Sequence, residues 1–277
     1  MPLPDDIHRL HHQALARPGD PVVWAQLVVA LHAVEGAALE GLHGAPSRAG
    51  DELMSAEDAL AHTDELVRNC LSFGLIEPAT SAAELLHTAI GSEATAILLA
   101  EVTLRRNEVG DIDRARKLLE ATVEHRPDAR EARVRAAALA LGTGDLAAAH
   151  HWIEPIAADN AGTRALYAQI LLAEGHVEAA AHEALLGLEG DPEAVDLHLL
   201  LGVAELAQAH NEAAIESFSE ALRLAPERTE AYYNLGLAFV ATGSRAAAMG
   251  VVEAGLELAP DDERLHALFQ RLRSSLA

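Results

Sequence analysis

The sequence predicts an all-α protein made of repeated antiparallel helix pairs, and three observations support this prediction. A glycine or other small residue recurs along the chain, always with an alanine five positions later. Prolines recur in the same register. Half of the 277 residues are hydrophobic but only 3% are aromatic, a composition that suits helices packed closely through Ala, Leu and Val side chains.

The two small-residue series have the same spacing, with steps of 34, 31, 34 and 34 residues. The first series is Gly110, Gly144, Gly175, Ala209 and Gly243, and the second is Ala115, Ala149, Ala180, Ala214 and Ala248. The recurring prolines are Pro127, Pro192, Pro226 and Pro260. Repeats of this length stack into solenoids in which each unit contacts only its neighbours, so no break between domains is needed.

Residues 229–262 show how one repeat forms a helix pair. Apolar and small residues lie at the i, i+3, i+4 and i+7 positions of a first helix, from Tyr232 to Phe239. Gly243 suits a left-handed turn into a second helix, and Pro260 stops that helix.

Small residues within these helices predict close packing. Gly236 lies on the first helix, and Ala248 and Gly255 lie on the second. We expect helix backbones to approach closely at these three positions, because a larger side chain would push the helices apart.

At this level of detail the sequence strongly resembles the tetratricopeptide repeat (TPR) family, a helix-turn-helix repeat of about 34 residues. The best matching segments are HLLLGVAELAQAHNEAAIESFSEALRLAP and YYNLGLAFVATGSRAAAMGVVEAGLELAP. They carry the family pattern at Gly202, Ala214, Phe218, Ala221, Pro226, Leu235, Gly236, Phe239, Ala248 and Pro260. The resemblance covers roughly two thirds of the chain and implies a right-handed superhelical solenoid of helix pairs.

We expect five repeat units, at residues 96–129, 130–160, 161–194, 195–228 and 229–262. Residues 60–95 are predicted to form a degenerate helix pair of the same kind. Residues 1–59 are predicted to be an N-terminal helical segment with a Gly- and Pro-containing loop near 36–52, and residues 263–277 a capping helix. The unit at 130–160 is short and carries Pro155, which predicts a shortened or kinked second helix.

The charge balance limits the kinds of partner. The formal net charge is −23 and the sequence pI is about 4.9, which argues against nucleic acid because phosphate binding needs clustered Lys and Arg. The N-terminal residues lack the pattern of a secretory signal, and no apolar run is long enough to insert into a membrane. We therefore expect an acidic, soluble, cytoplasmic protein.

Candidate chemical groups are few. His8, His11 and His12 share one helical face and could present imidazoles to a metal, but no carboxylate or cysteine completes the set, and a solvated cluster is the preferred interpretation. Cys70, the single cysteine, lies in an apolar row and is interpreted as a core residue. No phosphate-binding loop or nucleophile motif is present. We expect no catalytic residues, no bound metal and no cofactor.

The resemblance implies that first helices line a concave groove, with the second, fifth, ninth, twelfth and thirteenth residues of each repeat pointing into it. The resulting groove row is mainly apolar and comprises Leu104, Val134, Ala138, Leu141, Gln169, Leu172, Leu199, Val203, Leu206, Tyr233, Leu237 and Val240. An acidic edge is predicted from Glu131, Asp196 and Glu230. The Lys, Arg and Asn pattern with which some TPR co-chaperones bind a C-terminal carboxylate is not matched here.

These features predict a non-catalytic adaptor or scaffold for protein–protein interactions. The expected partner is a peptide or amphipathic helix of another protein, with apolar anchors and basic flanks. The alternative is a self-assembling scaffold, a homo-oligomer whose groove is covered by its own N-terminal segment or by another copy.

Overall fold

The computed structural model describes residues 5–17, 20–39 and 56–274. Within these ranges the chain forms fifteen α-helices and one short 3-10 helix, and no strand. The all-α prediction is confirmed. Helix contacts divide the chain into two compact units, residues 1–136 and 137–277.

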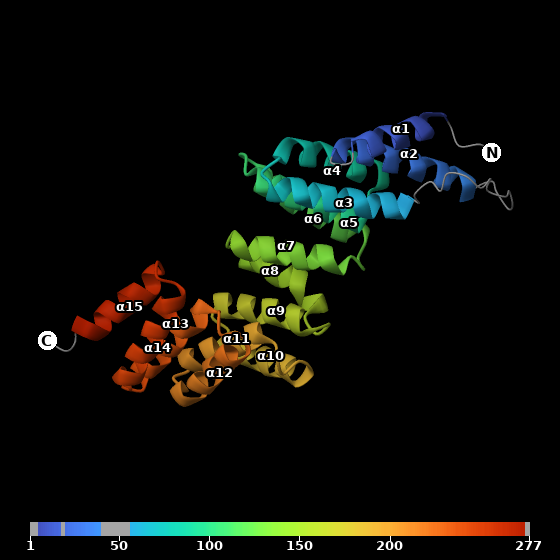
Figure 1. The fold of residues 1–277 in the computed structure, drawn as a ribbon. Coiled ribbons are helices and arrows are strands. Elements are labelled where there is room, and N and C mark those ends of the chain that lie inside the picture. Colours follow the sequence, from blue (N-terminus) through green and yellow to red (C-terminus); the bar gives the residue numbers. More distant parts are fainter. Residues whose placement is uncertain (1–4, 18–19, 40–55, 275–277) are drawn as a thin grey trace. The chain divides into compact units, whose positions relative to one another are not determined.

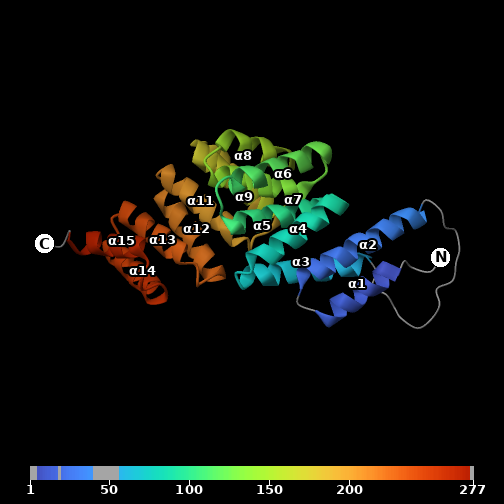
Figure 2. The same ribbon diagram turned by 90° about the horizontal axis from the view of Figure 1, so that it is seen from above.

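The N-terminal unit consists of consecutive helices (Figures 1 and 2), and short turns join those from α3 onward. Their bounds are α1 Asp5–Ala16, α2 Pro21–Leu39, α3 Ala56–Ser72, α4 Ile76–Ile90, α5 Glu93–Arg106 and α6 Asp111–His125. The unit ends within α7 Arg130–Gly142. A continuous core joins α1 to α5, and Trp24, Leu27 and Leu86 are among its most buried side chains.

The C-terminal unit contains the remaining helices, each packed against the next along the chain (Figure 1). Their bounds are α8 Leu146–Ile153, η1 Glu154–Ile156, α9 Ala161–Glu174, α10 Val177–Gly190, α11 Val195–Ala207, α12 Asn211–Leu224, α13 Thr229–Ala241, α14 Arg245–Leu258 and α15 Glu263–Ser274. The first helices α9, α11, α13 and α15 also contact one another in that order. This pattern of contacts is that of stacked helix pairs.

The turn glycines adopt the backbone conformation that the repeat predicted. Gly110, Gly144, Gly175 and Gly243 all have φ between 75° and 90°. A residue with a Cβ atom is strained in this left-handed region. Ala209, which replaces glycine in one repeat, nevertheless has a φ of 60°.

The helix pairs approach closely where small residues were predicted. A Cβ atom built on Gly236 would lie 2.8 Å from Cγ2 of Val252, and one on Gly255 would lie 2.8 Å from Cβ of Tyr232. Ala248 has no exposed surface. Close packing of the helices therefore requires the small residues at all three positions.

Two further predictions, each about a single segment, can be compared with the structure. The second helix of the 130–160 segment is shortened, since α8 has eight residues and gives way to a 3-10 turn that contains Pro155. Residues 36–39, at the start of the loop expected near 36–52, belong instead to α2, which continues to Leu39. The rest of that loop, residues 40–52, and the last three residues of the expected capping helix lie outside the described residues.

None of the described helices combines the length and the apolar character needed to cross a bilayer.

Candidate functional site

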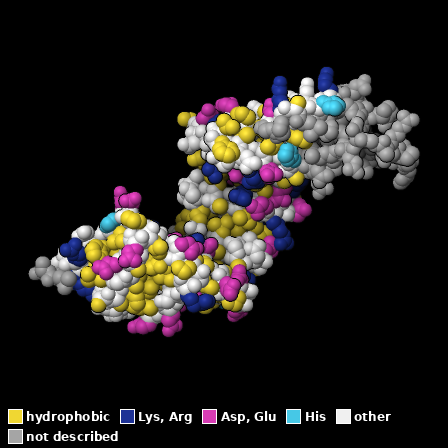
Figure 3. Space-filling model, viewed as in Figure 1, with side chains coloured by type: hydrophobic (Ala, Val, Ile, Leu, Met, Phe, Trp, Pro, Cys, Tyr) yellow, Lys and Arg dark blue, Asp and Glu magenta, His cyan; other side chains and the backbone are white. Residues whose placement is uncertain are grey.

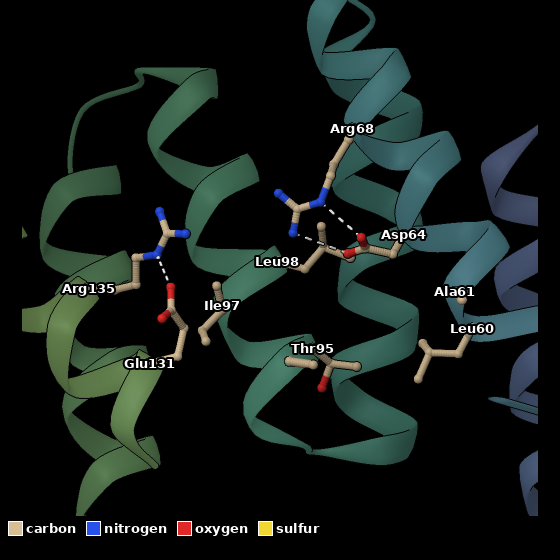
Figure 4. Close-up of a pocket in the computed structure, with 10 residues that line it drawn as sticks. Leu60, Ala61, Asp64, Arg68, Thr95, Ile97, Leu98, Glu131 and Arg135 are labelled. Atoms are coloured by element: carbon tan, nitrogen blue, oxygen red, sulfur yellow. Dashed lines mark hydrogen bonds and ion pairs between the residues drawn. The ribbon is translucent and has the colours of Figure 1, made fainter. Parts of the chain in front are cut away.

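First helices of the N-terminal unit form a pocket of about 420 Å³ between α3, α5 and the first turns of α7. Figure 4 shows α5 in the middle, with α3 and α7 on either side. The lining residues are Leu60, Ala61, Asp64, Arg68, Ala94, Thr95, Ile97, Leu98, Glu131 and Arg135. All of them belong to one compact unit.

The floor of the pocket is apolar, and hydrogen bonds at the N-termini of α5 and α7 fix the helices that form it. Ile97 and Leu98 are buried on α5. The Ser92 side chain caps this helix by accepting a hydrogen bond from the Thr95 backbone N–H at 3.2 Å. The Glu93 carboxylate accepts a hydrogen bond from the Ala132 backbone N–H at 2.9 Å, which ties the start of α7 to α5.

The entrance of the pocket is open because small side chains line it. Ala61 of α3 and Ala94 of α5 are both exposed to solvent there.

The walls of the pocket carry paired charges. On α3, the Arg68 guanidinium lies 2.9 Å from Asp64 and 2.7 Å from Glu101 of α5. These carboxylates raise the pKa of Arg68, with the Asp64 hydrogen bond as the largest cause. On α7, Arg135 lies 2.9 Å from Glu131. Three carboxylates thus face two guanidinium groups, which leaves a small negative excess around the apolar floor.

Most of this pocket was missed by the prediction from sequence, because no residue of the groove row lines it and only Glu131 of the acidic edge does. The groove positions were assigned only from the repeat unit that begins at residue 96, because residues 60–95 match the repeat poorly. Applied from residue 60, the same second, fifth and ninth positions are Ala61, Asp64 and Arg68, and all three line the pocket. The repeat positions thus point to these pocket residues, but the poor match of residues 60–95 to the repeat concealed them.

The structure places the predicted groove row mainly at half-buried positions. Leu199 is buried at 5% exposure in a cluster with Phe218 and Leu235. Ala138 and Gln169 are exposed. The other members are half-buried, namely Leu104, Val134, Leu141, Leu172, Val203, Leu206, Tyr233, Leu237 and Val240. Several of these contact the cores between neighbouring helices, which occupies part of their apolar surface.

A second pocket, of about 400 Å³, lies in the C-terminal unit between α13 and α15. Tyr233 and Leu237 line it together with Arg264 and Arg271. The Arg264 guanidinium lies 5.6 Å from the centroid of the Tyr233 ring, a cation–π contact. Figure 3 shows hydrophobic side chains spread over this unit with Asp and Glu side chains at their borders.

The predicted acidic edge is only partly free of counter-charges. Glu131 pairs with Arg135 as described. Asp196 pairs with Arg228 at 2.5 Å, and both side chains are exposed to solvent. Glu230 is exposed on α13. Exposed pairs of this kind contribute little stability, so a partner's cation can compete for these carboxylates.

The candidate chemical groups lie apart from both of these pockets. Cys70 is buried in the N-terminal core, where burial raises the pKa of its thiol. His12 lies on α1, whereas the side chains of His8 and His11 lie outside the described part of the chain. Among the described residues, no three His, Cys, Asp or Glu side chains lie close enough to hold a metal ion.

Comparison with known proteins agrees with the helix-pair architecture. Two models of the tetratricopeptide repeat match the chain, one over residues 108–154 and the other over residues 205–272. Curated proteins contain no match to this chain.

Solved TPR structures share the fold at low sequence identity. TTC0263, a TPR protein of Thermus thermophilus, is 20% identical with a TM-score of 0.54, covering 65% of this chain and 98% of its own. YrrB, described as a TPR protein with an unusual peptide-binding site, is 16% identical with a TM-score of 0.52, covering 68% and 98%. The APC/C hetero-tetramer Cut9–Hcn1 contains a chain that is 12% identical with a TM-score of 0.62, covering 97% of this chain and 46% of its own. The repeat matches and the stacked helix pairs together identify the chain as a protein that contains tetratricopeptide repeats.

Proposed function

We propose that this protein is a non-catalytic adaptor that binds an extended or helical segment of a partner protein against its first helices. The pocket between α3, α5 and α7 is the observation that carries this proposal, because it combines an apolar floor with charged walls. Such a site holds an apolar side chain and orients the residues beside it. YrrB has a similar fold and is described as having a peptide-binding site, which supports a peptide-binding role for this chain.

The chemistry of the lining favours binding over catalysis. Its one hydroxyl group, on Thr95, donates a hydrogen bond to the Ser92 backbone carbonyl at 3.0 Å and is almost fully buried. Its carboxylates are held in ion pairs. No nucleophile is therefore positioned beside a base within this pocket.

The preferred partner segment carries an apolar anchor next to Arg or Lys. The anchor would cover Ile97 and Leu98, while the cation would compete with Arg68 or Arg135 for the wall carboxylates. The half-buried row of the C-terminal unit, with Glu230 at its edge, is proposed as a separate contact site for a partner segment.

Filling the pocket is expected to abolish peptide binding. Ala94→Trp places an indole at the exposed entrance, where it occupies space without replacing a core residue. Peptides selected on the wild type from a phage-displayed random library should carry an apolar residue beside a basic one. Their dissociation constants, measured by fluorescence anisotropy, should rise at least about tenfold on the variant, as for loss of a hot spot.

The matched control is Ala121→Trp, which adds the same side chain at an exposed position of α6 outside the lining. This variant should bind the selected peptides as the wild type does. Equal binding to wild type and Ala94→Trp, or failure to select any peptide, would contradict the proposed pocket function.

A further inference from the structure

Two neighbouring turns of the N-terminal unit expose large apolar side chains. Phe73 and Leu75, in the α3–α4 turn, are 80% and 53% exposed, and Val109 and Ile112, in and after the α5–α6 turn, are 107% and 49% exposed. Seven large hydrophobic side chains are exposed among the described residues, and four of them belong to these two turns. We call these four residues the apolar turn edge.

The two turns lie at the same edge of the unit because the helices that lead into them run in parallel register. Arg68 of α3 contacts Glu101 of α5 at 2.7 Å, and Glu84 of α4 contacts Arg114 of α6 at 2.8 Å. Figure 1 shows both turns at the same end of these helices. The four side chains therefore lie at the same edge of the unit, and none of them lines the pocket.

The fold does not require apolar residues at these turns. Phe73 and Val109 each directly precede a left-handed glycine. The residues that directly precede the left-handed residue of the other helix-pair turns are polar, namely Thr143, Glu174, Gln208 and Thr242. Since the turn itself needs only the glycine or its substitute, Phe73 and Val109 are not required for folding. An exposed apolar area of this kind marks a contact surface.

Charge indicates what covers this surface. Residues 105–117 hold five basic and three acidic residues, a local excess of two positive charges in a chain of net charge −23. Next to Ile112, the exposed pair Asp113 and Arg116 supplies both signs. Two copies of so acidic a chain repel over most of their surfaces, but this edge carries apolar groups and both signs of charge. In a two-fold contact, Asp113 of each copy can therefore face Arg116 of the other copy beside the apolar side chains.

We propose that two copies of this chain associate through the apolar turn edge in a two-fold symmetric contact, which buries Phe73 and Val109 against the second copy. Covering these side chains removes apolar surface from water. The contact leaves the pocket free in each copy, because none of the four residues lines it. The dimer would therefore present two peptide sites.

Sedimentation equilibrium over a series of protein concentrations tests this proposal. The wild type should show a monomer–dimer equilibrium, and Phe73→Asp with Val109→Asp should raise the dimer dissociation constant at least about tenfold. The matched control is Leu185→Asp with Leu258→Asp, which changes two leucines that are about half exposed on other helices. The control should dimerise as the wild type does.

Salt distinguishes this contact from one based on charge attraction. Added salt should strengthen the wild-type dimer, because it screens the repulsion between two chains of net charge −23. Should the Asp variant lose helical circular dichroism, Phe73→Thr with Val109→Thr repeats the test with the residue that occupies two of the other turns. A wild type that stays monomeric, a variant that dimerises unchanged, or open-ended oligomers would each overturn the proposal.

Discussion

Replacing Gly255 with valine should destabilise the C-terminal helix pairs by about 1–3 kcal/mol, the usual cost of overpacking a tight core. A Cβ atom at this position would lie 2.8 Å from Cβ of Tyr232 and 3.0 Å from Cδ1 of Leu265. The Tyr232 Cβ atom moves only with the backbone of α13, and the Tyr232 hydroxyl donates a hydrogen bond to the Pro226 carbonyl at 3.0 Å. The helices must therefore separate.

Thermal unfolding followed by far-UV circular dichroism measures this effect. Gly250→Val is the matched control, because it makes the same change on the same helix where no atom lies within 4 Å of the new Cβ. That control should be neutral or stabilise by a few tenths of a kcal/mol, since valine is a better helix former than glycine. Equal stability of the two variants would show that α13 and α14 are not closely packed at Gly255.

Asp111→Asn should lower the midpoint of thermal unfolding by several degrees at neutral pH. The Asp111 carboxylate is nearly fully buried and accepts hydrogen bonds from Arg106 Nη2 at 2.5 Å and from the Glu108 backbone N–H at 2.8 Å. The substitution leaves Arg106 without its main counter-charge and weakens the turn into α6. Asp113→Asn, at a 67% exposed carboxylate in the same helix, should have little effect.

The destabilisation should also depend on pH. The Arg106 hydrogen bond is the largest cause that lowers the pKa of Asp111 from 3.8 to about 2. A carboxyl group whose folded pKa is lowered stabilises the fold above its unfolded pKa and loses that contribution as pH falls through the folded value. The difference in unfolding midpoint between wild type and Asp111→Asn should therefore shrink as the pH falls from 4 to 2. A gap that stays constant in this range would contradict the assigned role.

The candidate site was only partly predictable from sequence. The repeat pattern predicted that first helices line the binding surface, and it listed Glu131, which lines the pocket. It also listed Leu199, whose side chain is buried against Phe218, because a one-dimensional pattern cannot show which apolar residues a neighbouring helix covers. Arg68 and Asp64 were omitted because their repeat departs from the pattern, although their helix lies beside α5 in the structure.

Local sequence by itself determined the helix pairs, their left-handed turns and their close contacts. Gly243 and Gly255 have these roles in any helix pair of this kind, since steric limits on the backbone and on helix separation act over a few residues. The shortened α8 likewise follows from Pro155 alone. The tertiary structure decided which side chains remain accessible, because accessibility depends on neighbours about one repeat away. The pocket beside Ile97 and the exposed edge at Phe73 and Val109 are therefore visible only once the helices are stacked.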